Sequence, residues 1–155
     1  MSMQNTESSS SHWLSCTDGI ATAWQDFLLL VGRILLGWVF VFYGWTHIAD
    51  MPAFAKTFPN RGLPEWLAYI ASPVELIGGV LLVVGLATRY TALVLVLFMI
   101  VASFSSHAYW SVPAAQKGNQ MAHFWKNISM MGGLIAVFIT GAGAYALDRM
   151  FGGKR

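Results

Sequence analysis

The sequence predicts an all-α fold, an integral membrane four-helix bundle with a short N-terminal interfacial helix. Of the 155 residues, 56% are hydrophobic and only 10% are charged, whereas a soluble domain carries about 25% charged residues. The mean hydropathy is +0.57. Four apolar segments each approach the ~20 residues that an α-helix needs to cross ~30 Å of hydrocarbon. The chain is therefore predicted to cross a lipid bilayer four times.

The N-terminal arm, residues 1–25, is polar and precedes the first apolar segment. Residues 1–11 are rich in serine, which predicts partial disorder, and they show no cleavable signal peptide. Within residues 12–26, Trp13 and Trp24 predict the short helix that lies at the membrane interface.

The four membrane spans are predicted at residues 27–47, 66–87, 91–107 and 122–140. Short connections join them, so residues 26–150 are expected to form one transmembrane domain, and residues 151–155 a short basic tail. The connection after the first span contains three prolines and a glycine, and we expect it to fold over the mouth of the bundle. Paired glycines at positions 78–79 and 132–133 are expected to let helix backbones approach closely.

An even number of spans places both termini on one side of the membrane. Five basic residues fall on that side (Arg33, Arg89, Arg149, Lys154 and Arg155) and four on the other (Lys56, Arg61, Lys117 and Lys126). The positive-inside rule therefore favours cytoplasmic N and C termini in a bacterial inner membrane. The span ends opposite the termini carry an aromatic belt of Trp45, Trp66, Trp110 and Trp125.

Several classes of function have no support in the sequence. A net charge of +2, without a basic run, gives no sign of nucleic-acid binding. The single Cys16 excludes an internal disulfide. The sequence shows no nucleophile–base arrangement, phosphate-binding loop or paired carboxylate motif, so no catalytic residue is assigned and it stays open whether the chain is an enzyme.

Two charged side chains, Arg33 and Glu75, fall inside predicted spans. Measured from the two membrane edges, their heights differ by only ~7 Å. Charged groups at such depth are rare, pair with a partner and are functional candidates, so we expect an internal Arg33–Glu75 pair. Two alternatives stay open. Ser72, Pro73 and Glu75 match a capping box at a helix start, or Pro73 kinks one continuous helix.

A second set of polar side chains gathers at the outer ends of the spans. This candidate ligand pocket comprises Tyr43, His47, His107, His123, Lys126 and Asn127. At one level of a bundle these residues suit a quinone head group, a haem or a metal. Neighbouring aromatic residues favour a quinone or similar amphipathic ligand without covalent attachment. A metal is not expected, because His-x-x-x-His and Cys-x-x-Cys patterns are absent. The alternative is that these histidines are simply solvated.

Three long stretches of the sequence together resemble the DoxX family of small four-helix bacterial membrane proteins, over residues 27–150. The residues that carry the resemblance are Arg33, Gly37, Glu75, Gly78, Gly79, Gly85, Thr88, Arg89, Phe124, Lys126, Asn127, Gly141, Gly143, Tyr145 and Asp148. The chain departs from the family pattern at His47, where a lysine is common. It also departs at Ala142 and Ala146, where a proline and a serine are common.

The resemblance implies a role in redox chemistry at the membrane, because the family takes its name from a membrane subunit of a thiosulfate:quinone oxidoreductase. We expect a membrane subunit or anchor of a quinone-linked oxidoreductase complex, whose other membrane or soluble subunits carry the redox cofactors. The alternatives are a non-catalytic scaffold or assembly factor, and a small proton-coupled transporter in which Glu75 relays a proton. Membrane lipid surrounds the chain in every case, and a homo-oligomer is compatible with each.

Overall fold

The computed structural model describes residues 17–151, and these residues form helices and connections without a β-strand. The four long helices are α1 (Asp18–Ala49), α3 (Ala68–Val84), α4 (Thr88–Ser106) and α5 (Ala114–Thr140). Between α1 and α3 lie α2 (Met51–Ala55) and the 3₁₀ turns η1 (Pro59–Arg61) and η2 (Glu65–Leu67), and α6 (Asp148–Phe151) follows α5. The all-α prediction is confirmed.

Three of the described helical stretches are long and apolar enough to cross a membrane. They are Asp18–Ala49, Glu65–Val84 and Thr88–Ser106, and they coincide with the first three predicted spans. The fourth predicted span, residues 122–140, lies in α5. This helix is less apolar because it begins in a polar connection and includes Lys126 and Asn127.

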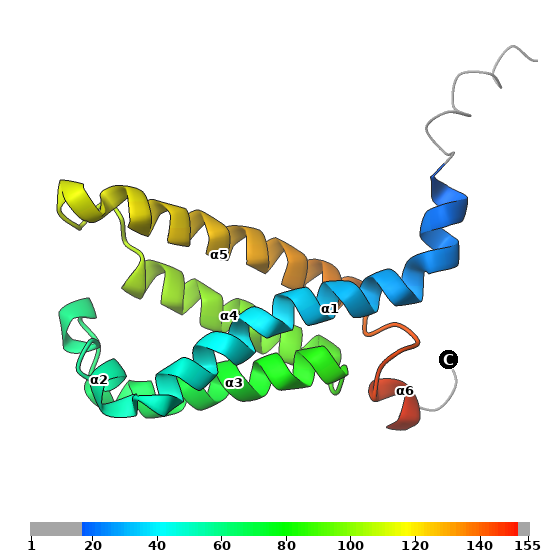
Figure 1. Cartoon of the computed structure of the whole chain (residues 1–155), viewed down its shortest axis with the longest axis horizontal. Coiled ribbons are helices and arrows are strands. Elements are labelled where there is room, and N and C mark those ends of the chain that lie inside the picture. Colours follow the sequence, from blue (N-terminus) through cyan, green and yellow to red (C-terminus); the bar gives the residue numbers. More distant parts are fainter. Residues whose placement is uncertain (1–16, 152–155) are drawn as a thin grey trace, which may run out of the picture.

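α1 begins before the predicted first span. Its first turns use residues expected in the polar arm and the interfacial helix, and they continue into the long helix without a break. In Figure 1 these turns, drawn in dark blue, point away from the bundle. The first sixteen positions of the predicted arm, including residues 12–16 of the interfacial helix, lie outside the described residues, as does the tail at 152–155.

The bundle consists of two helix pairs, α1 with α3 and α4 with α5 (Figure 1). Glycines bring the antiparallel α1 and α3 together. A Cβ atom on Gly37 would lie 2.9 Å from the carbonyl oxygen of Gly79, and one on Gly44 would lie 2.5 Å from the backbone nitrogen of Leu76. Backbones this close leave no room for a larger residue, as is common between membrane helices.

The expected packing role is confirmed for both glycines of the first pair and for Gly133. Gly78 faces Leu95 of α4, and Gly133 faces Leu36 of α1. For Gly132 the expectation was wrong, because its Cβ would meet nothing within 4 Å.

α3 runs through Pro73 as one helix that begins at Ala68. The capping-box alternative was therefore wrong, because Ser72 is buried inside the helix instead of preceding it. Glu75 consequently lies about two turns into α3, where its carboxylate needs a partner from another helix.

The end of the bundle opposite α2 is closed by the C-terminal segment, residues 141–151. This segment folds back over the turn between α3 and α4 (Figure 1). The backbone N–H groups of Leu147 and Asp148 donate to the carbonyl oxygens of Val84 and Gly85, at 3.1 and 2.8 Å. The apolar core lies between this end and the end of the bundle near α2. Its almost fully buried residues include Phe40, Leu82, Leu95 and Leu134.

Candidate functional site

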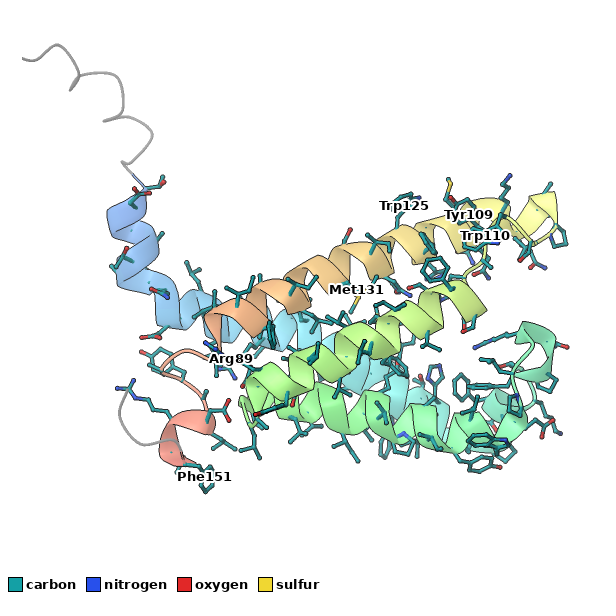
Figure 2. All side chains as sticks on the ribbon, turned by 180° about the vertical axis from the view of Figure 1, so that it is seen from behind. Arg89, Tyr109, Trp110, Trp125, Met131 and Phe151 are labelled. Carbon is teal, nitrogen blue, oxygen red and sulfur yellow. The ribbon has the colours of Figure 1, made fainter. Side chains whose placement is uncertain are left out.

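The end of the bundle near α2 contains a cavity of about 510 Å³. Side chains from all four long helices and from the connection between α1 and α3 line it. The lining includes all six residues of the candidate ligand pocket: Tyr43, His47, His107, His123, Lys126 and Asn127. Figure 2 shows Tyr109, Trp110 and Trp125 near the same end, where α4 passes into α5. The structure thus brings the six residues together in one cavity.

The carboxylate of Glu75 pairs with His47 in the wall of this cavity. Glu75 Oε2 lies 2.8 Å from His47 Nδ1, and the two side chains are 13% and 28% exposed. The His47 ring is stacked on that of Phe54, with the ring centroids 3.8 Å apart. Because an ionised carboxylate can only accept hydrogen bonds, an ionised Glu75 keeps a proton on Nδ1 and leaves Nε2 of His47 for another partner.

The predicted Arg33–Glu75 pair was wrong. The contact of Gly44 with Leu76 sets the register of α1 against α3, and this register places Glu75 beside His47. Arg33 lies ~21 Å from His47 along α1. The prediction placed Arg33 two turns inside the membrane, whereas the structure places it level with the turn that ends α3.

Arg33 is fully buried against the C-terminal end of α3. Its guanidinium donates hydrogen bonds to the carbonyl oxygens of Leu82 and Val83, at 3.4 and 3.3 Å, and to that of Tyr145. The last carbonyls of a helix lack partners within the helix and carry the negative end of its dipole. Gly85 is required here, because a Cβ atom would collide with the guanidinium. Arg33 therefore joins α1, α3 and the C-terminal segment, away from the cavity.

The α4–α5 side of the cavity carries the other two histidines and a lysine. The rings of His107 and His123 are stacked, with centroids 5.0 Å apart, and His107 Nδ1 lies 2.8 Å from Gln120 Oε1. Lys126 Nζ lies 3.4 Å from His123 Nδ1 and 5.2 Å from the centroid of the Tyr43 ring. Lys126 thus spans the cavity from α5 to α1 through a cation–π contact.

Arg61 is a lining residue that the sequence did not single out. Its Nη1 donates to Ser106 Oγ at 2.9 Å, and its guanidinium lies over the rings of Phe54 and Phe58. Burial lowers the pKa of Arg61, but a guanidinium stays charged in proteins. The prediction that this connection folds over the bundle mouth is confirmed, because its residues line the cavity. The same prediction could have indicated that Arg61, the arginine of this connection, lies at the cavity.

The cavity offers more hydrogen-bond donors than acceptors. Arg61 and Lys126 are cationic, and the Asn127 amide is a further donor. Its one lining carboxylate, Glu75, is already paired with His47. The remaining lining is mostly apolar, so the site suits a flat ligand with carbonyl or anionic oxygens. In residues 17–151, no group of three or more His, Cys, Asp and Glu side chains is arranged to hold a metal ion.

In a comparison with known protein families, residues 28–108 of the chain match the DoxX family. The chain is 31% identical over 124 residues to inner membrane protein YphA of Escherichia coli strain K12, and this match covers 79% of the chain and 89% of YphA. It is 30% identical over 130 residues to inner membrane protein YqjF of the same strain, and this match covers 84% of the chain and 96% of YqjF. A shorter match, 37% identical over 71 residues, covers 46% of the chain and 53% of the "Putative oxidoreductase CatD" of Bacillus subtilis strain 168. No solved structure matches the chain.

Proposed function

Because the chain belongs to the DoxX family and its E. coli relatives are inner membrane proteins, we propose that its cavity binds the head group of a quinone. In this proposal the chain is the membrane subunit or anchor of a quinone-linked oxidoreductase complex in the bacterial inner membrane. The observation that carries the proposal is the convergence of donor groups from both helix pairs on one cavity that is otherwise mostly apolar.

The chemistry of a quinone head group fits these walls. The head is a flat ring whose carbonyl oxygens accept hydrogen bonds on opposite edges. Lys126 on α5 donates from one side, His47 on α1 can donate from Nε2 on the other when its ring is protonated, and the aromatic ring of Tyr43 lies between them. The apolar lining replaces water around the ring, which strengthens each of these polar contacts.

The His47–Glu75 pair suits the proton chemistry of a quinone. Reduction to the hydroquinone takes up two electrons and two protons. In the reverse direction, oxidation of the hydroquinone releases two electrons and two protons. With Nδ1 held by Glu75, His47 can accept one of these protons at Nε2, and the adjacent carboxylate stabilises the imidazolium that forms, while the second proton leaves to water at the cavity mouth. We place the electron carriers on partner subunits. The name of the B. subtilis relative, "Putative oxidoreductase CatD", supports a redox setting.

We place both termini in the cytoplasm and the cavity mouth at the opposite, periplasmic face. The start of α1 and α6 both lie toward the closed end of the bundle (Figure 1), and the count of basic residues favours that end as the cytoplasmic one. A quinone would then exchange protons with the periplasm.

Direct binding tests the proposal. The protein is reconstituted in lipid nanodiscs and titrated with tailless ubiquinone and, separately, with menadione, by isothermal calorimetry. We expect saturable binding of at least one quinone. Glu75→Gln should weaken it about tenfold, because the amide no longer stabilises a protonated His47. Glu65→Gln is the matched control, since Glu65 is exposed on η2 and does not line the cavity.

Two results would contradict this proposal. If neither quinone binds the wild-type protein, quinone binding is contradicted. If partner subunits are nevertheless retained in the same preparation, the scaffold role is favoured instead. Equal affinity of Glu75→Gln and wild type removes the His47–Glu75 pair from the site.

A further inference from the structure

A second, shallower hollow lies on the outside of the bundle, between α3 and α4. This apolar groove has a volume of about 380 Å³. Its walls include Ile77 and Leu81 from α3 and Tyr90 from α4. The hydroxyl of Thr91 also lines it but is satisfied by the carbonyl oxygen of Leu86, at 3.3 Å. The groove is therefore an apolar surface, and its Thr91 hydroxyl is not available to bind a polar ligand.

The groove and the cavity share part of their walls. Val74 of α3 and Val94 of α4 line both. Val94 is 49% exposed, so no other part of the described chain covers it on the groove side. Gly78, one turn from Val74, contributes no side chain to the groove, and a Cβ atom there would lie 2.7 Å from Leu95. Two valines thus stand between the cavity that carries the donor groups and the apolar groove on the lipid-facing surface.

The direction of the groove matches that of a lipid chain. From the shared valines it follows α3 toward Leu81 and α4 toward Ala87, a length of ~10 Å along each helix. It runs away from the cavity mouth, toward the closed end of the bundle, and lies within helices that are long and apolar enough to cross a membrane.

We infer that the cavity and the groove form one binding site for an amphipathic ligand with a polar head and a long apolar tail. This inference rests on the proposed function and specifies its ligand as an isoprenoid quinone. The head group occupies the cavity, and the tail leaves sideways between Val74 and Val94 and lies along the groove. In a bilayer the tail gains no hydrophobic free energy from this contact, since lipid is equally apolar. The groove contributes by close packing against a tail that the head group holds in place.

Paired quinones and paired variants test the inference. Wild-type protein in nanodiscs is titrated with tailless ubiquinone and with a ubiquinone that carries two isoprene units. Ile77→Trp fills the groove only, and Val94→Trp fills the passage from the cavity. Leu93→Trp is the matched control, because Leu93 is 45% exposed on α4 and lines neither space. Partitioning of each quinone into lipid is the same for every variant, so differences between variants report the protein.

We expect Ile77→Trp and Val94→Trp to weaken binding of the tailed quinone by about tenfold, from lost packing contacts. Binding of the tailless quinone to Ile77→Trp should stay unchanged, and Leu93→Trp should bind both quinones like wild type. Unchanged affinity of Ile77→Trp for the tailed quinone overturns the inference, even when the head group binds. Absence of tailless-quinone binding to wild type contradicts the proposed function itself.

Discussion

At the scale of single residues, Arg33 and Glu75 show two ways in which this bundle accommodates a charge. Arg33 is fully buried, and its Nη1 and Nη2 groups donate to three carbonyl oxygens. The oxygens of Leu82 and Val83 carry the negative end of the α3 dipole, and a hydrogen bond to a charged group contributes ~1.5–3 kcal/mol. Glu75 instead pairs with His47 at the cavity, where a ligand can reach both. Arg33 therefore stabilises the fold, whereas Glu75 belongs to the site.

We expect Arg33→Met to destabilise the protein by about 3 kcal/mol, because it leaves the buried carbonyls of Leu82 and Val83 without their donor. The measurement is the unfolding temperature of purified protein in detergent. Arg149→Met is the matched control, since Arg149 is exposed on α6, and it should unfold like wild type. If Arg33→Met does so as well, the guanidinium has no structural role.

The pocket residues could be predicted because each lies at the outer end of a span. Helix ends that reach the same membrane face must lie at one level, and this places His47, His107 and His123 together without knowledge of packing. The partner of Glu75 could not be predicted in this way. It depends on the register of α1 against α3, which is set by backbone contacts at Gly37 and Gly44.

At the scale of helices, the N-terminus of α4 receives its cap from the far end of the chain. Ala87 precedes α4 with a left-handed φ of 49°, and the first amides of a helix lack partners within it. The carboxylate of Asp148 accepts hydrogen bonds from the N–H groups of Ala87 and Thr88, the latter at 2.9 Å. Burial alone would raise the pKa of Asp148, but these bonds and the charge of Arg33 hold the pKa below its ordinary value.

This cap predicts a pH dependence of stability. A lowered folded-state pKa means that the ionised carboxylate stabilises the fold. The contribution is complete above the ordinary aspartate pKa of about 3.9 and is lost as the pH falls through the folded-state value. We expect Asp148→Asn to unfold at a lower temperature than wild type at pH 7 and to lose less stability between pH 5 and pH 3. Asp18→Asn, in the exposed first turn of α1, should keep the wild-type profile. Parallel profiles for Asp148→Asn and wild type would count against the cap.

The positions of the long helices could be predicted from the apolar segments of the sequence, but the folding of the C-terminal segment back onto the bundle could not. The predicted fourth span ends at Thr140, where α5 ends, because Gly141 follows with a positive φ of 80°. The return of residues 141–151 onto the α3–α4 turn depends on hydrogen bonds between distant segments, which no local pattern reports. The capping-box alternative failed for a related reason. Four earlier residues from Ala68 extend α3, so Ser72 became internal.

At the scale of the whole molecule, the two ends of the bundle differ in how they are closed. At the closed end each helix terminus meets a charge of suitable sign: Arg33 at the C-terminus of α3, and Asp148 at the N-terminus of α4. Arg89, labelled in Figure 2, donates to the carbonyl oxygen of Ile139 near the C-terminus of α5, at 3.2 Å. At the other end the polar side chains point into a cavity. One end therefore fixes the helices, and the other encloses a cavity lined by polar side chains.

This asymmetry makes the orientation in the membrane a functional question, which cysteine labelling answers. In a Cys16→Ser background, Asn60→Cys reports the cavity end and Met150→Cys reports the closed end, and both positions are exposed. We expect a membrane-impermeant maleimide to label Asn60→Cys in intact spheroplasts, and Met150→Cys only after the inner membrane is lysed. The physical reason is that basic residues at the closed end are retained on the cytoplasmic side during insertion. The opposite labelling pattern would turn the cavity toward the cytoplasm, and the proposed quinone site would then exchange protons with the cytoplasm instead of the periplasm.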